Sequence, residues 1–590
     1  NARLVVDKLY RYVHDKDFSS WKNNICIAAD DGDEAIHAEQ ADRGSDTLLL
    51  KNTSQPRLGF RVNKIYIDSY YMDPQTKKYP EANRELMKQF NEGMLVFNYI
   101  GHNDPEVGFT GEGLFSRYEM DHLTNTRLPL FITITCDYCQ FDAEDVSAGE
   151  NVFLNPSAGA IALITTTRVV YTDGNDKINR RLMKRLFDRD SNGSPLRIGD
   201  VLKLAKRDFN TEIDKNKLNY VLIGDPALKL AYPEHSIQVT RINGNSGEKN
   251  IEMIPGKNYT VEGERRSHQN ELLSDFNGYI YYNLYDKEKQ FTTLAHQDEK
   301  TWTYTHRPDL LTTGKGTIQN GTFRITVALP IDNSHSGKSG LLNLYAYDES
   351  GREANGYTDK LIVSTAVEPI TEDIQGPDIE FAGINDDSFT EGILVNNPAT
   401  FVCKFSDPSG IWSGNSLGKQ MTLSLDGACI EENVARYYKP IAESEIPEGE
   451  FIYPLPRLSN GLHTLTFKVF DTLGNSSEVT IAFEVKENSE TYTISLEEEP
   501  ATERATISCQ DQNGNDVTES KHTRISVTNT LGEEIWSYET TENNLFPLTW
   551  NLQDNNGKRV SAGQYYCKGY FETSAGTIVT PAKKIVVITQ

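Results

Sequence analysis

The sequence predicts a multidomain protein in which an N-terminal α/β domain precedes three all-β sandwich domains. A length of 590 residues corresponds to roughly four domains of about 150 residues each. Up to residue 232, strand-like and helix-like segments alternate, which indicates a mostly parallel sheet covered by helices. After Pro233 the helical periodicity fades, and short alternating strands separated by Gly, Asn and Asp indicate antiparallel sandwiches.

The first domain, residues 1–232, contains apolar segments of strand length with helical patterns between them. The expected strands are Ile25–Ala29, Lys64–Ile67, Met94–Ile100, Leu128–Thr135, Ala158–Thr165 and Tyr220–Ile223. The expected helices are Ala2–His14, Glu81–Asn91, Asp176–Phe187 and Ile198–Phe209. In folds of this kind, ligands bind at the carboxyl ends of the strands.

The remaining chain divides into three β units, at residues 233–367, 368–488 and 489–590. A polar linker, Glu368–Pro377, separates the first unit from the second. Each unit contains alternating segments typical of half-buried strands. Examples are Gly278–Asp286, Gly340–Asp348, His463–Asp471, Thr523–Thr528 and Tyr565–Phe571.

The composition excludes several classes of partner. Lys and Arg number 59 and Asp and Glu number 85, so the formal net charge is −26. This charge argues against binding to nucleic acid, which needs a basic surface, and against unaided docking on anionic lipid. The longest apolar runs, such as Gly159–Ile164 and Leu128–Ile134, are far shorter than the ~20 residues that span a bilayer.

The first residues have the pattern expected in the middle of a protein sequence rather than at its start. Residue 1 is Asn rather than Met, and no basic segment followed by an apolar one comes after it. Because Ala2–His14 already has a helical pattern, we expect the chain to be the C-terminal part of a longer protein, without its N-terminal region.

The cysteines give no sign of a metal site. There are seven, so at least one is unpaired. Cys136 and Cys139 lie three positions apart without a second such pair, which does not make a four-ligand zinc site, and we expect no cofactor. The pairs that an oxidising compartment would allow are Cys403 with Cys429, and Cys509 with Cys567.

Two reactive side chains directly follow neighbouring strands of the predicted sheet. Gly101 and His102 follow one strand, and Cys136 follows another. Both positions lie at the carboxyl edge, where an imidazole could deprotonate a thiol whose ordinary pKa is about 8.5. A lone Cys at a strand end is more often a small core residue, and a lone His in a loop is more often a surface residue. The residues alone leave catalysis and these structural roles open.

An acidic segment, Asp30-Asp31-Gly32-Asp33-Glu34, follows a third expected strand. A carboxylate at this edge would fix the tautomer of the histidine and stabilise its imidazolium form. The alternatives are a solvated acidic turn or a cation site. Since the segment lacks the twelve-residue pattern of calcium loops, a structural calcium ion is only weakly indicated.

The motifs around these residues resemble those of the gingipain (C25) cysteine peptidases. The resemblance covers about residues 2–232 and rests on several pieces in the same order. They are Tyr99-Ile100-Gly101-His102, Leu123-Thr124-Asn125, Leu128-Pro129, Cys136-Asp137-Tyr138-Cys139-Gln140-Phe141, and Asn219 to Leu228 with its Gly224-Asp225-Pro226 turn.

The resemblance implies a caspase-like fold and assigns roles to the site residues. Cys136 would be the nucleophile and His102 the general base and acid. The backbone of Asn103 and Cys136 would form the oxyanion hole. Asp31 would orient His102, because an acidic residue just before a Gly does so in the family. Glu34 aligns with the region that lines the primary specificity pocket.

This chain departs from the family pattern at two positions. The family usually has Gly after the catalytic His, where this chain has Asn103, and Gly three residues after the Cys, where this chain has Cys139. The second departure raises the question of which Cys reacts. The position directly after the strand, and the spacing to Phe141, favour Cys136, so that Cys139 would be a packing residue beneath the site.

Beyond the peptidase segment, the sequence resembles the sortases of the type IX secretion system within this family. The pieces are Ala28–Asp33 with His37, Gln40 and Ala41; Asp407–Ile411; Leu423–Gly427; Gly461–Leu465; and, in the last unit, Trp550–Leu552, Asn556-Gly557, Ser561–Tyr565 and Ala582–Val587. The last unit resembles a C-terminal sorting domain, with a plain FlgD-like sandwich as the alternative, and the unit at 368–488 is expected to be an Ig-like sandwich.

This resemblance implies an enzyme at the outer surface of a Gram-negative cell. It would remove the C-terminal signal domain of exported cargo and join the new C-terminus to anionic lipopolysaccharide, anchored by an outer-membrane barrel of the PorV type. The alternatives are a secreted gingipain-like protease, or a surface scaffold with a vestigial peptidase domain. Joint presence of His102, Cys136 and Asp31 disfavours the scaffold.

Overall fold

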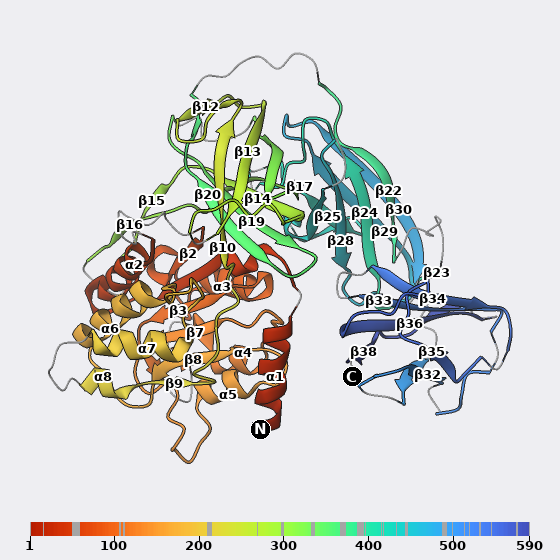
Figure 1. The fold of residues 1–590 in the computed structure, drawn as a ribbon, viewed down its shortest axis with the longest axis horizontal. Coiled ribbons are helices and arrows are strands. Elements are labelled where there is room, and N and C mark those ends of the chain that lie inside the picture. The colour runs from red at the N-terminus through yellow and green to blue at the C-terminus, as the bar shows by residue number, and fades with distance from the viewer. Residues whose placement is uncertain are drawn as a thin grey trace.

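The computed structural model covers the full chain and shows four regions along it (Figure 1). The described residues are all except 1, 16, 50–58, 105–107, 110–112, 209–214, 268, 297–299, 332–336, 366–372, 386–393, 396, 415, 417, 432, 443–445, 486–491, 498–499, 512–513, 519, 530–532, 544, 574–575 and 589–590. Phe209, the expected end of one helix, and residues 368–372 of the expected linker therefore lie outside the described residues.

The first region is an α/β domain around one six-stranded sheet, drawn in red to yellow in Figure 1. The strand order is β2 (Arg61–Tyr66), β1 (Asn24–Ala29), β3 (Val96–Ile100), β7 (Leu130–Ile134), β8 (Ala162–Thr166) and β9 (Tyr220–Ile223). All neighbouring pairs are parallel except β8 and β9. The helices are α1 (Ala2–His14), α2 (Ile36–Leu49), α3 (Pro80–Glu92), α4 (Arg117–Asp121), α5 (Ala148–Leu154), α6 (Thr172–Arg185), α7 (Ile198–Arg207) and α8 (Lys215–Asn219).

Helices cover both faces of this sheet, as the sequence predicts for an α/β domain. In β1, Ile25 and Ile27 join a core shared with α2, α6 and α7, whereas Cys26 and Ala28 join a core shared with α3 and α5. Successive side chains of a strand point to opposite faces, so a strand buried on both faces needs a continuous apolar run. This need explains why the strands of the sheet could be predicted from apolar segments of the sequence.

One long helix, α2, was not predicted. Its buried side includes His37, Gln40, Asp42 and Ser45, so the helix lacks a clean apolar stripe. The carboxylate of Asp42 is held by Lys64 Nζ at 2.5 Å, which allows it to be buried. Periodicity of apolar residues therefore fails as a signal here.

The first β unit differs from the predicted sandwich. Its strands form a single eight-stranded sheet, and a parallel pairing between β10 and β20 closes the sheet on itself. Along the sheet, the strands are β11 (Asn245–Ser246), β10 (His235–Ile242), β13 (Asn258–Arg266), β18 (Thr322–Ala328), β17 (Leu310–Gln319), β14 (Gly278–Tyr285), β19 (Leu341–Asp348) and β20 (Glu353–Thr358). Two small additions are the pair β12 (Ile251–Met253) and β21 (Leu361–Val363), and the hairpin β15 (Lys289–Thr292) and β16 (Thr303–His306).

The second β unit consists of two sheets that enclose one core, which agrees with the predicted sandwich. One sheet contains β22 (Asp378–Ile384), β24 (Thr400–Ser406), β28 (Glu448–Pro454) and β27 (Tyr438–Ile441). The other contains β23 (Leu394–Val395), β30 (Ser476–Val485), β29 (Gly461–Phe470), β25 (Thr422–Leu425) and β26 (Ala428–Glu431).

The third β unit also has two sheets around one core. They contain β31 (Thr493–Leu496), β32 (Ala505–Gln510) and β35 (Leu548–Trp550), and β34 (Glu534–Thr540), β33 (His522–Asn529), β36 (Gly563–Thr573), β37 (Gly576–Val579) and β38 (Lys583–Val587). All seven cysteines of the chain are free thiols, so neither candidate disulfide is formed. Among the described helices, none has both the length and the apolarity needed to cross a membrane.

The α/β domain and the first β unit share a buried polar interface. Asn23 donates from Nδ2 to Oδ1 of Asn343 at 3.2 Å, and Asn343 donates to the carbonyl of Gly59 at 2.9 Å. Beside them, Lys22 Nζ lies 2.7 Å from Glu353 Oε1, and the two side chains are only 5% and 13% exposed. Burial raises the pKa of Glu353, and the ammonium group of Lys22 opposes that shift.

We predict that Lys22→Met destabilises the chain by about 3–5 kcal/mol, because Glu353 would keep a buried charge without its partner. Urea unfolding of the full chain measures the loss, and the double variant Lys22→Met/Glu353→Gln should recover most of it. A matched control is Arg324→Met, which breaks the more exposed pair with Glu262 and should cost at most about 1 kcal/mol. A Lys22→Met variant as stable as the control would contradict the role of this pair.

Candidate active site

Parallel register brings three strand ends together at the carboxyl edge of the α/β sheet. Ala29 of β1 pairs with Ile100 of β3, and Ile100 pairs with Ile134 of β7. The residues that follow these strands are therefore neighbours. They are the acidic turn from Asp30, the Gly101-His102 loop and the Cys136 loop, the arrangement that the sequence predicted.

Asp30 fixes the backbone of the histidine loop. Its Oδ2 accepts a hydrogen bond from the backbone N–H of His102 at 2.6 Å. The hydroxyl of Tyr99 lies 2.8 Å from the carbonyl oxygen of His102 and 3.2 Å from Asp30 Oδ2. A Cβ on Gly101 would lie only 2.3 Å from Cγ of Asp30, so only glycine fits between the two loops.

The side chain of His102 is held by Asp33. Nε2 of His102 lies 3.0 Å from Oδ2 of Asp33, and both side chains are about half exposed. When Nε2 carries the proton and donates it to this carboxylate, Nδ1 is left with the lone pair that can accept a proton. The contact thus selects the tautomer that a general base needs.

The carboxylate that contacts the ring of His102 is that of Asp33, whereas Asp31 was the predicted orienting residue. Asp31 is buried, and its Oδ2 accepts a hydrogen bond from the hydroxyl of Tyr79 on the other side of the turn. Gly32 has φ 95°, and residues 33, 34 and 35 have φ between 51° and 62°. This left-handed run changes the direction in which successive side chains point. The carboxylate of Asp33 then lies beside the imidazole of His102.

Cys136 sits at the end of β7 with its thiol half-buried. Its Sγ lies 3.5 Å from the carbonyl oxygen of Val170. The amide of Asn103 donates from Nδ2 to the carbonyl of Cys136 at 3.1 Å and so ties the histidine loop to the cysteine loop. Asn103 itself begins the short strand β4 (Asn103–Asp104), where it pairs with Phe109. The oxyanion hole assigned to the backbone of Asn103 and Cys136 stays a prediction.

Cys139 has the environment of a packing residue. It is fully buried, and desolvation raises the pKa of its thiol to about 12. A Cβ on Gly149 would lie 2.8 Å from the Cβ of Cys139, which shows how tightly the thiol side chain is enclosed. A thiol this difficult to ionise is a poor nucleophile, which favours Cys136.

The first β unit reaches the site through the β15–β16 hairpin, a contribution that the sequence did not suggest. Glu34, the predicted specificity residue, is exposed and lies 3.5 Å from Nζ of Lys300. The buried carboxylate of Asp68 accepts hydrogen bonds from the backbone N–H groups of Ala295 and His296, at 2.7 and 3.0 Å. Ala295, His296 and Lys300, which lie between β15 and β16, are thus near the acidic turn.

His37 of α2 is a further member of the site. In the sequence it belongs to a motif without an assigned role. Its ring is buried, with Nδ1 2.6 Å from Asp30 Oδ1 and Nε2 3.7 Å from Asp33 Oδ2. The rings of His37 and His102 meet edge to face with centroids 4.9 Å apart. Two histidines and two carboxylates therefore share this corner.

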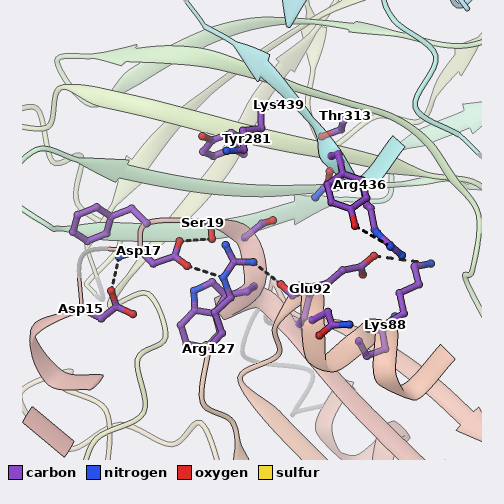
Figure 2. A pocket seen from close by; sticks show the side chains of 18 of the residues that line it. Asp15, Asp17, Ser19, Lys88, Glu92, Arg127, Tyr281, Thr313, Arg436 and Lys439 are labelled. Atoms are coloured by element: carbon purple, nitrogen blue, oxygen red, sulfur yellow. Dashed lines mark hydrogen bonds and ion pairs between the residues drawn. The ribbon is translucent and has the colours of Figure 1, made fainter. Parts of the chain in front are cut away.

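A cleft of about 2760 Å³ lies away from these catalytic candidates, between the α/β domain and all three β units. Figure 2 shows charged side chains on both of its walls, and several are already paired with one another. Arg127 Nε lies 2.6 Å from Asp17 Oδ2, for example. Among the described residues that line the cleft, Asp33, His102 and Cys136 do not appear. The cleft is therefore separate from the candidate active site.

Comparison with known protein families identifies the first domain. The sequence model of "Peptidase family C25" matches residues 1–231. The first domain is a cysteine peptidase domain of family C25. The match ends where the α/β domain ends, so the β units lie outside it.

Two solved structures are similar to parts of this chain. Dimeric latent PorU from Porphyromonas gingivalis is 24% identical with a TM-score of 0.32, and the match covers 74% of this chain but only 41% of that one. A complex of the RgpB pro- and mature domains from Porphyromonas gingivalis is 17% identical with a TM-score of 0.32, and covers 61% and 74% of the two chains. A search of curated proteins found no match.

The geometry suits the chemistry of a cysteine peptidase. The Asp33–His102 contact prepares an imidazole that can take the proton of a thiol and later return it to a leaving amine. His102 is half exposed and Cys136 half-buried, so a peptide chain can approach both from solvent.

We predict that Asp33→Asn lowers kcat/KM by about 10-fold to 10⁴-fold, because the amide no longer stabilises the imidazolium form of His102. Asp31→Asn should cost less, because its Oδ1 can still accept the hydrogen bond from Tyr79. Steady-state kinetics with a peptide substrate compares the two variants. A larger loss in Asp31→Asn than in Asp33→Asn would return the orienting role to Asp31.

The two cysteines should differ sharply in reactivity. We predict that iodoacetamide at neutral pH labels Cys136 and leaves Cys139 unlabelled, because the Cys139 thiol is buried and hard to ionise. Cys136→Ala should abolish peptide cleavage, whereas Cys139→Ala should retain most of it. Mass spectrometry of the alkylated chain locates the label, and a label on Cys139 in the native protein would overturn the assignment.

Proposed function

We propose that this C25 peptidase is a sortase that removes the C-terminal signal domain of type IX secreted cargo and joins the new C-terminus to anionic lipopolysaccharide. The observation that supports the proposal is that His102 and Cys136 follow neighbouring parallel strands at one edge of the sheet, in a chain whose last β unit has motifs that resemble the sorting domain. We also propose that the peptidase domain is caspase-like and that the last two units are Ig-like or FlgD-like.

In this reaction, the thiolate of Cys136 attacks the carbonyl carbon of the scissile peptide bond. The C–N bond breaks, the departing amine takes a proton from His102, and a thioester remains on Cys136. An amine of the acceptor then attacks the thioester and loses a proton to His102. A new amide bond forms and the thiolate is regenerated. When water attacks instead, the products are those of hydrolysis.

We propose a surface location at the outer membrane, with a barrel of the PorV type as the anchoring partner. The net charge of −26 gives little electrostatic attraction to anionic lipid, so a protein partner is the better physical anchor. The last β unit, which resembles the sorting domain, would carry this contact. The alternative is a secreted gingipain-like protease that transfers every acyl group to water.

The prediction that separates these functions concerns the C-termini of cargo proteins. Cells with the native chain should carry cargo whose C-terminus is cut and joined through an amide bond to a saccharide amine. Cells with Cys136→Ala should accumulate full-length cargo, and Cys139→Ala serves as the matched control. Mass spectrometry of cargo C-termini reads both outcomes. Identical cargo in native and Cys136→Ala cells would exclude the sortase function.

A further inference from the structure

Three side chains at the catalytic corner point their ligand atoms toward one another. Nε2 of His102 lies 3.0 Å from Oδ2 of Asp33, and Nε2 of His37 lies 3.7 Å from the same oxygen. All three ligand atoms lie within 4.8 Å of one another. We propose that Asp33, His37 and His102 form a binding site for a divalent transition metal of the zinc class, and that metal bound there inhibits the peptidase.

The distances fit a single ion. Tetrahedral zinc with bonds of about 2.0–2.1 Å to nitrogen and oxygen places neighbouring ligand atoms about 3.3 Å apart. The two separations to Asp33 Oδ2, 3.0 and 3.7 Å, lie on either side of this value. Two imidazoles and one carboxylate also form a common zinc set, in which water takes the fourth position.

The surroundings of His37 are those of a metal ligand. Its Nδ1 lies 2.6 Å from Oδ1 of the buried Asp30, and its Nε2 lies 3.7 Å from Oδ2 of Asp33, so a ring with its proton on Nδ1 presents Nε2 on the side of Asp33. A carboxylate behind a ligating histidine fixes the tautomer and raises the basicity of the ring. His37 is buried, whereas Asp33 and His102 are about half exposed, so an ion can enter from solvent.

Metal on Nε2 of His102 would disable the base. A neutral imidazole carries one proton, and coordination at Nε2 leaves that proton on Nδ1. Nδ1 then has no lone pair to accept the proton of the Cys136 thiol, and Asp33 is drawn from the histidine to the metal. The peptidase is held inactive until the metal is removed, without any covalent change to Cys136.

Binding can be tested apart from activity. The full-length Cys136→Ala chain, which lacks the thiol as a competing ligand, is titrated with ZnCl2 by calorimetry in a buffer free of chelators and phosphate. We expect one site. In this background, His37→Gln and Asp33→Asn should each weaken binding at least tenfold, and His122→Gln, an exposed histidine elsewhere in the domain, should leave it unchanged.

Inhibition is tested on the chain that keeps Cys136. With TCEP as reductant, ZnCl2 should slow iodoacetamide labelling of Cys136, EDTA should restore it, and His37→Gln should need at least tenfold more ZnCl2 for the same effect. Thermal unfolding checks that His37→Gln is folded. Zinc binding that disappears in Cys136→Ala, or that is unchanged in both His37→Gln and Asp33→Asn, would overturn the proposal. Neither result bears on the sortase function, which depends on the cargo products.

Discussion

The carboxylate of Asp30 is the group around which the candidate site is built. A buried carboxylate is costly unless charge-assisted hydrogen bonds compensate for the lost water. Asp30 Oδ2 accepts them from the backbone N–H of His102 and the hydroxyl of Tyr99, and Oδ1 lies 2.6 Å from Nδ1 of His37, so the acidic turn, the histidine loop and α2 meet at one group. The close approach of Asp30 to Gly101 fixes the spacing of the two loops. Any change at Asp30 would therefore move both histidines together.

The peptidase domain and the first β unit form one structural unit around this centre. At the amino ends of the strands, the buried Lys22–Glu353 pair joins them. At the carboxyl ends, Asp68 holds the β15–β16 hairpin beside the acidic turn. Because both contacts bury charge, removing either partner of one of them would leave a buried charged group unpaired. The hairpin thus belongs to the construction of the active-site edge, although it lies outside the matched peptidase family.

The sequence predicted those features that depend on local pattern. The strands before Asp30, His102 and Cys136 are mostly apolar because the sheet is buried on both faces, and parallel register then places their ends together. The features it missed depend on tertiary structure. The helix α2 buries polar groups on its inner side. The left-handed run from Gly32 places Asp33, and not Asp31, beside His102. The first β unit closes through a pairing between strands that lie over a hundred residues apart in the sequence.

The two departures from the family pattern have different physical consequences. Cys139 replaces a glycine inside a tightly packed region, where its thiol is enclosed and its pKa is raised by burial. It fills space and leaves the chemistry to Cys136. Asn103 replaces a glycine beside the histidine, and its amide hydrogen-bonds to the carbonyl of Cys136. A glycine has no side chain for this bond, so Asn103 adds a direct link between the His102 loop and the Cys136 loop. This link restricts the motion of one loop relative to the other, and proton transfer depends on their relative position.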